Sequence, residues 1–180
     1  MTVGVTGHRH LAALDRIREG IDEAIEMLHG RLRDGGLTLI SPLAEGSDRL
    51  VATRILMRSN ARLIVPLPMP VNEYVKDFGT AESRAEFSAL LENAAEVVTL
   101  PPTPTRSAAY QAVGRYVLDH SDALIAVWDG RPGHGTGEVV DEARRRNKPI
   151  AWVHAGNVDP VTGEPTSLGR EQGSLTLERF

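Results

Sequence analysis

The fold is decided by the stretch ALIAVWDGRPGHGTGEVVDEARRR, residues 123–146. Its apolar start, residues 123–127, predicts a buried strand, and residues 139–146 predict a helix. The loop between them holds four glycines, so it joins the carboxyl end of a strand to the amino end of a helix. A structural turn could use the same glycines. However, glycine lets the backbone approach a ligand, and the unpaired N–H groups of a helix start attract an anion. We expect a ligand site here, with phosphate as the anion.

Alternation of strands and helices extends along the chain in both directions. Apolar runs predict strands at residues 2–6, 37–41, 62–67, 96–100, 123–127 and 150–154. Helical periodicity predicts helices at residues 14–32, 47–58, 80–94, 106–120 and 139–146, with Gly35 and Gly36 ending the first. Nearly continuous apolar strands are buried on both faces, and strict alternation favours a parallel sheet. The predicted fold class is α/β: a Rossmann-like, doubly wound, mainly parallel sheet of about six strands with helices on both faces.

The domain organisation follows from length and from a change in composition. The chain has 180 residues, the size of one domain with a full core. Residues 1–155 are expected to form the Rossmann-like ligand-binding domain. Residues 156–180 are rich in Gly, Pro, Thr and Glu and have little apolar periodicity, so we expect an extended or partly disordered tail.

Composition and charge exclude several classes of function. No apolar run approaches the ~20 residues of a membrane span, and the amino terminus lacks the pattern of a signal peptide, so we expect a cytoplasmic protein. The absence of cysteine excludes disulfides, thiolate nucleophiles and cysteine-ligated metals. A net charge of -4 and an aromatic content of 4% argue against nucleic acid as a partner.

Ligands of such sheets bind beyond the carboxyl ends of the strands, at the switch in strand order. After the first predicted strand, Gly7 allows a tight turn and Arg9 offers a forked cation to a phosphate. His8 and His10 are too few ligands for a complete metal site, so no metal is expected. Tyr110 has the helical spacing of an ordinary core or edge residue.

The loop after the second predicted strand carries Glu45, Gly46, Ser47 and Asp48. Carboxylates at such a strand end accept hydrogen bonds from ribose hydroxyls, and Gly46 would permit close backbone approach. Ser47 or Asp48 would also serve as a cap of the following helix. Asp48 is able to do both.

The loop after the fifth predicted strand supplies the remaining candidates: Asp129, Gly130, Gly135, Thr136 and Glu138. Asp129 is placed to hold a ribose or a catalytic water, and Thr136 to cap the helix while contacting a phosphate. Glu138 lies in the first helical turn, where a carboxylate interacts favourably with the helix dipole. It would alternatively accept a ribose hydroxyl or act as acid or base beside a glycosidic bond. Both interpretations of Glu138 stay open.

Three motifs form a recognisable set: TGHR at residues 6–9, LAEGSDRLVA at 43–52, and AVWDG at 126–130 followed by GTGEVV at 135–140. Together they resemble the SLOG superfamily, the Rossmann-like relatives of the cytokinin-activating LOG proteins and the DNA-processing protein A family. The resemblance spans residues 2–154 and is closest to stand-alone bacterial members.

The resemblance implies binding of a nucleotide or nucleotide-derived ligand, such as an ADP-ribose-like molecule, by a homodimer with a sensing or processing role. LOG phosphoribohydrolases carry the loop Pro-Gly-Gly-x-Gly-Thr-x-x-Glu. This chain departs from it: His134 stands at the second glycine, and Glu138 is one position early.

We therefore expect Arg9, Gly135 and Thr136 to hold phosphate, Glu45 and Asp48 to hold or flank ribose, and Asp129 and Glu138 to line the same crevice. No cofactor is expected. The alternative is a hydrolase of N-glycosidic bonds, or phosphoribohydrolase, that acts on a nucleoside monophosphate with Glu138 and Asp129 as catalytic residues.

Overall fold

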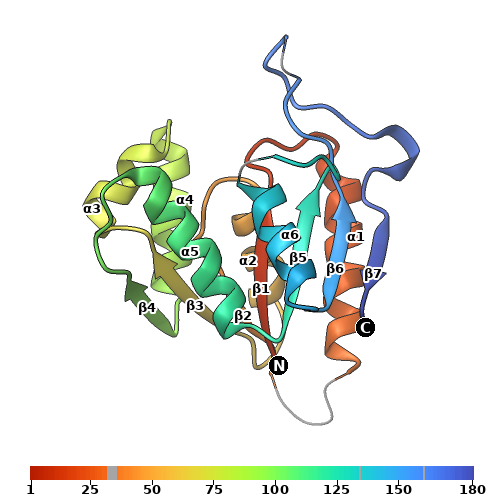
Figure 1. The fold of residues 1–180 in the computed structure, drawn as a ribbon, viewed down its shortest axis with the longest axis horizontal. Coiled ribbons are helices and arrows are strands. Elements are labelled where there is room, and N and C mark those ends of the chain that lie inside the picture. Colours follow the sequence, from red (N-terminus) through yellow and green to blue (C-terminus); the bar gives the residue numbers. More distant parts are fainter. Residues whose placement is uncertain (32–35, 134, 160) are drawn as a thin grey trace.

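A computed structural model describes residues 1–31, 36–133, 135–159 and 161–180. Those residues form a seven-stranded sheet in the order β4-β3-β2-β1-β5-β6-β7 (Figure 1). The strands are β1 (Thr2–Gly7), β2 (Thr38–Ile40), β3 (Arg62–Leu67), β4 (Glu96–Thr99), β5 (Ala123–Trp128), β6 (Ile150–His154) and β7 (Leu175–Glu178). All neighbours pair in parallel except β6 and β7, which are antiparallel. The predicted Rossmann-like, mainly parallel sheet is confirmed.

Helices cover both faces of this sheet (Figure 1). They are α1 (Leu14–His29), α2 (Ser47–Leu56), α3 (Val71–Tyr74), α4 (Ala81–Glu92), α5 (Arg106–His120) and α6 (Thr136–Arg145), with 3-10 turns η1 (Val75–Asp77) and η2 (Gly169–Glu171). Helices α1, α2 and α4 pack into one hydrophobic cluster, and α5 and α6 pack into the other. The sequence predicts that the first helix reaches residue 32, but α1 ends at His29 with Gly30 as its C-cap; Leu32 and Gly35 themselves lie outside the described residues.

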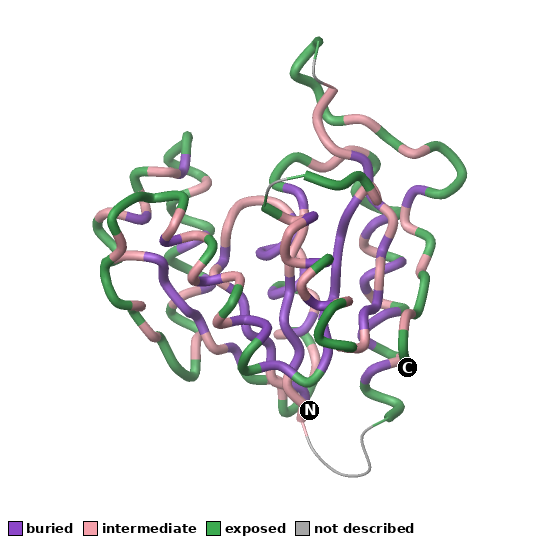
Figure 2. Tube along the Cα trace, viewed as in Figure 1, coloured by how far each residue is buried: buried purple, intermediate pink, exposed green. Residues whose placement is uncertain are grey.

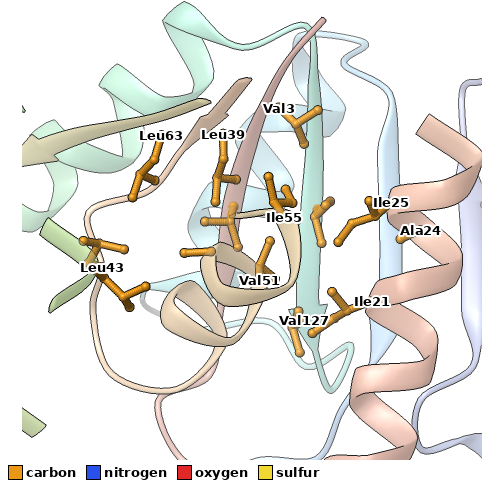
Figure 3. Close-up of a cluster of buried hydrophobic side chains, with 14 of the residues drawn as sticks. Val3, Ile21, Ala24, Ile25, Leu39, Leu43, Val51, Ile55, Leu63 and Val127 are labelled. Carbon is orange, nitrogen blue, oxygen red and sulfur yellow. The ribbon is translucent and has the colours of Figure 1, made fainter. Parts of the chain in front are cut away.

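The larger cluster fills the space between the central strands and helices α1 and α2 (Figure 3). Helix α1 buries Ile17, Ile21, Ile25 and Leu28, which recur at the predicted helical spacing. Leu14 belongs to the same series but is 39% exposed, because it opens the helix at the edge of the packed layer. Full burial of each such side chain stabilises the fold by roughly 1.5–3 kcal/mol. Buried residues accordingly run along the central strands (Figure 2).

The segment after β6 differs from the expected tail. Its residues 175–178 form β7, which adds a seventh strand to the sheet. Buried Gln172 anchors the segment: its amide oxygen accepts from the N–H groups of Gly156 and Leu168, and its amide nitrogen donates to the carbonyl of Ala12. Composition alone underestimates such a segment, because one buried amide that makes three hydrogen bonds orders a polar stretch.

The switch in strand order lies at β1, which has β2 on one side and β5 on the other. The chain leaves β1 toward α1 on one face of the sheet and leaves β5 toward α6 on the other. The connections therefore diverge at the carboxyl ends of β1 and β5. A crevice at this point is the usual ligand site of doubly wound sheets.

Candidate functional site

A pocket of about 660 Å³ opens at this switch point. Its volume falls in the range of roughly 300–1,000 Å³ that is typical of small-molecule sites. The end of β1, the loop before α2, one face of α5 and the start of α6 form its walls. The described lining includes six of the predicted site residues: Gly7, Arg9, Asp48, Gly135, Thr136 and Glu138. It does not include the other five: Glu45, Gly46, Ser47, Asp129 and Gly130.

Gly7 and Ser47 form a packing contact between the end of β1 and the start of α2. A Cβ atom on Gly7 would lie 2.5 Å from the Cβ of Ser47 and 2.6 Å from the carbonyl oxygen of Val127. Ser47 is fully buried, and its hydroxyl donates to the carbonyl of His8 at 2.8 Å. Glycine is therefore required at position 7 to let two segments of the chain meet, and Ser47 joins them.

Gly46 also lies in close contact with another segment of the backbone. Its φ is +80°, and a Cβ atom there would lie 2.6 Å from both the carbonyl carbon of Arg9 and the carbonyl oxygen of His8. The neighbouring carboxylate of Glu45 accepts a hydrogen bond from the hydroxyl of Ser83 on α4. The loop after β2 thus uses both residues to fix its own position.

Asp48 is the member of that loop that reaches the pocket, although it is only 6% exposed. Its Oδ2 accepts a hydrogen bond from the N–H of Ala44 at 3.2 Å. Burial raises the pKa of this carboxyl to about 7, against the opposing effects of the Ala44 hydrogen bond and the charges of Arg9 and Arg49. Asp48 is therefore divided between its neutral and charged forms near neutral pH.

The expectation that Ser47 or Asp48 caps α2 is wrong. The N-cap is Gly46, and the two polar residues are the first two of the helix. A residue in the first turn cannot fold back onto the N–H groups that an N-cap satisfies. The Asp48 carboxylate instead bonds backward to Ala44.

Arg9 is exposed on the rim and is positioned by Tyr110. Its guanidinium carbon lies 5.7 Å from the centre of the Tyr110 ring. The Tyr110 hydroxyl donates to Asp77, and burial together with this carboxylate raises the pKa of Tyr110. Arg9 also forms a side-chain hydrogen bond with Tyr110, which opposes that shift. The tyrosine thus holds the guanidinium beside the pocket, where its remaining donors can meet an anion.

Helix α6 begins at the opposite wall. Its N-cap is Gly135, with φ +75°, which has no side chain to cap the helix. The expected capping role of Thr136 is therefore wrong, because Thr136 is the first helical residue. No described heavy atom outside its chain neighbours lies within 4 Å of a Cβ placed on Gly135, so the backbone is open to the pocket here. Glu138 follows in the first turn and also lines the pocket, whereas His134 lies outside the described residues.

Asp129 pairs with His8 instead of lining the pocket. Its Oδ1 lies 3.2 Å from His8 Nε2 and accepts a hydrogen bond from the N–H of Arg131 at 3.0 Å. The side chain is 8% exposed. Burial lowers the pKa of His8, and Asp129 opposes this shift. This pair links the ends of β1 and β5, and the next residue, Gly130, packs under the Trp152 ring.

The sequence interpretation missed the wall contributed by α5. Ser107, Tyr110, Gln111 and Gly114 recur at three- and four-residue steps and face the pocket together. Tyr110, expected to be an ordinary core or edge residue, belongs to this face. The spacing is visible in the sequence, but the same pattern describes any helix packed on a sheet.

No group of three or more His, Cys, Asp or Glu side chains in the described residues is arranged to hold a metal ion. None of their helices is long and apolar enough to cross a membrane.

Comparisons with known proteins support the fold. No family model and no curated protein matches the chain. Among solved structures, the chain is similar to the X-ray structure of TM1055, a structural genomics target, with a TM-score of 0.51 and 15% sequence identity. The match covers 83% of this chain and 71% of that chain. At this identity the likeness shows a common α/β fold.

Proposed function

We propose that this protein binds a nucleotide or nucleotide-derived small molecule, either a nucleoside phosphate or an ADP-ribose-like compound, and acts as a sensor of it. The phosphate binds at the amino end of α6, and the sugar lies toward Asp48. Membership of the SLOG superfamily is part of the same proposal, because residues of the motifs at 6–9, 43–52 and 135–140 line the pocket.

The open amino end of α6 is the observation that carries the proposal. The first intrahelical N–H there is that of Val139, which donates to the carbonyl of Gly135. The N–H groups before it have no partner inside the helix, and the helix dipole adds partial positive charge at the same end. An anion of the size of a phosphate satisfies these donors. The openness around Gly135 gives it room to approach.

Arg9 supports the same assignment from the other side. Its guanidinium is held over the Tyr110 ring at the rim of the pocket. A phosphate between α6 and Arg9 would accept hydrogen bonds from the N–H groups at the start of the helix, and the positive charge of Arg9 would balance its negative charge. The location at the strand-order switch agrees with the usual ligand site of this fold class.

Isothermal titration with adenosine 5′-monophosphate, ADP-ribose and inorganic phosphate tests the proposal. Arg9→Gln removes a charged hydrogen-bond donor worth about 1.5–3 kcal/mol, so affinity for a bound nucleotide should fall roughly 10- to 150-fold. Arg145→Gln is the matched control, because Arg145 is exposed at the far end of α6 and pairs only with Glu142 and the carbonyl of Asp141 among the described groups. Absence of saturable binding to every compound would overturn the proposal.

The alternative, hydrolysis of the N-glycosidic bond of a nucleoside monophosphate, is favoured by one observation. Glu138 lies in the pocket wall two residues after Thr136, close to the expected phosphate position. Asp129 is engaged with His8 and does not line the pocket, so of the two expected catalytic carboxylates Glu138 is the one in the pocket wall. Chromatography after long incubation with nucleoside 5′-monophosphates separates the two functions. Free base that accumulates with the wild-type protein and is lost in Glu138→Gln would replace the binding proposal with the hydrolase.

A further inference from the structure

Asp48 combines deep burial with an available acceptor atom. The carboxyl group is in the pocket wall although the residue is only 6% exposed. Oδ2 is bonded to the N–H of Ala44, whereas the described residues offer Oδ1 no hydrogen-bond partner. Oδ1 has no partner among the described residues, yet it is not fully buried, so it keeps access to solvent through the pocket. An acceptor in this position is suited to a ligand group.

The neighbouring cations do not pair with Asp48, although the Nη2 atom of Arg49 is buried and has no hydrogen-bond partner among the described residues. Arg49 donates from Nε to the carbonyl of Leu43 and from Nη1 to Ser83 and Glu86, and its guanidinium stacks on a Phe ring of the core. Arg9 stacks on Tyr110. Within the described residues neither arginine forms an ion pair with Asp48, so both act on it only through longer-range charge.

The other groups that face this part of the pocket do not neutralise Asp48 either. Tyr74 from α3 is buried beside it, and burial, together with the negative charge of Asp48, raises the pKa of the Tyr74 hydroxyl, which stays protonated. His8 and His10 line the pocket from the β1 loop, and Glu138 lines it from α6. The charged form of Asp48 is therefore costly in the empty pocket, because no cationic side chain of the described residues pairs with it directly to offset its burial.

We propose that Asp48 selects a ligand by accepting hydrogen bonds from a vicinal diol of its sugar, and that binding the diol expels the proton from Asp48 into solvent. The inference rests on the proposed function. It adds a reason for selecting between ligands and a coupling between ligand binding and pH. Hydroxyl donors stabilise the carboxylate over the carboxylic acid, since only the carboxylate offers Oδ1 as a charged acceptor. The negative charge of the Asp48 carboxylate would repel a phosphate on the 2′ hydroxyl, so a ligand with that phosphate would bind weakly.

Two readouts test this coupling on the complete protein. Titration of adenosine 5′-monophosphate at pH 6.5 in buffers of different ionisation enthalpy counts the protons released. With a carboxyl pKa of about 7, about three quarters of the empty molecules carry the proton at this pH, so Asp48 should release up to about 0.7 proton per ligand. The second readout compares this nucleotide with adenosine 2′,5′-bisphosphate, which should bind at least tenfold more weakly at pH 8.

Comparison of wild type with Asp48→Asn and with a matched control variant shows whether Asp48 is the source of the released proton. Protons from the ligand phosphate, the histidines and Glu138 are common to all variants, so only the difference between proteins reports Asp48. Asp48→Asn should lose the extra proton release and the discrimination against the 2′-phosphate. Asp15→Asn, at a carboxylate that is 92% exposed on α1, should keep both.

The outcomes distinguish this inference from the proposed function. If wild type and Asp48→Asn bind the nucleotide with equal proton release, the coupling is refuted while nucleotide binding stands. If Asp48→Asn does not fold, proton release by wild type with adenosine 5′-monophosphate and with its 2′,3′-dideoxy analogue decides, because both carry the same phosphate and only the first has the diol. Equal release with the two ligands between pH 6 and 7 contradicts the inference. If wild type binds no nucleotide at all, both proposals fall.

Discussion

Replacing Asp48 by Asn should stabilise the empty protein at alkaline pH and leave it nearly unchanged at acidic pH. Asn keeps the size of the side chain and an oxygen that accepts from the N–H of Ala44, but it carries no charge. Burial raises the pKa of Asp48 from 3.8 to about 7. At about 1.4 kcal/mol for each pKa unit, ionising the buried carboxyl costs at most about 4 kcal/mol of stability.

The sign follows from proton binding. Between pH 4 and 7 the folded wild type holds a proton on Asp48 that the unfolded chain has lost, so wild-type stability falls as pH rises through this window. The variant has no such group. Its advantage should therefore be near zero at pH 4, grow through the window, and level off above pH 7 at about 2–4 kcal/mol.

Urea unfolding of both proteins at several pH values between 4 and 8, followed by circular dichroism, measures this difference. The m-values should agree, since the surface exposed on unfolding is the same. Asp15→Asn serves again as the control for a charge lost from the surface. A stability difference between wild type and Asp48→Asn that does not vary with pH would refute the assignment of a buried, proton-bearing carboxyl.

Three further substitutions test other parts of the structure. Gly7→Ala places a Cβ 2.5 Å from that of Ser47, so it should destabilise the fold by about 1–3 kcal/mol in thermal or urea unfolding; an unchanged midpoint would show that the two segments do not meet as described. Gln172→Leu leaves three backbone groups without their partner and should cost at least about 1–3 kcal/mol, with faster hydrogen exchange in β7; normal protection there would argue against the anchoring role. Thr136→Val removes a hydroxyl at the start of α6 and should weaken binding of a phosphorylated ligand by ~1–3 kcal/mol in calorimetry, whereas equal affinities would take Thr136 out of the site.

Local patterns in the sequence were sufficient for most elements. The predicted bounds of residues 62–67, 106–120 and 150–154 coincide with β3, α5 and β6. The glycine-rich stretch does connect a strand to a helix, and its Gly135 opens toward the pocket. These features can be predicted from the sequence because buried residues repeat every two positions in a strand and every three to four in a helix. The residue types at the start of a helix are also characteristic.

Contacts between distant segments decided the roles of the loop residues. Ser47 looks like a cap or a ligand contact in the sequence, but its hydroxyl bonds to a carbonyl 39 residues away. Asp129 looks like a ribose or catalytic group, but its backbone N–H and carboxylate lie against a histidine 121 residues away. Neither partner can be inferred from spacing, because the strand order that brings β1 beside both α2 and β5 is set by tertiary packing.

The sequence by itself determined the α/β class, the positions of six strands and the region where polar loops converge, since each depends on periodicity or on residues adjacent in the chain. Only the tertiary structure separated residues that face the pocket from those that hold the loops together. It also placed the polar segment with Gln172 and β7 at the edge of the sheet. The physical reason is that a side chain's burial, charge state and free hydrogen-bonding atoms depend on its neighbours in space, as the raised pKa of Asp48 illustrates.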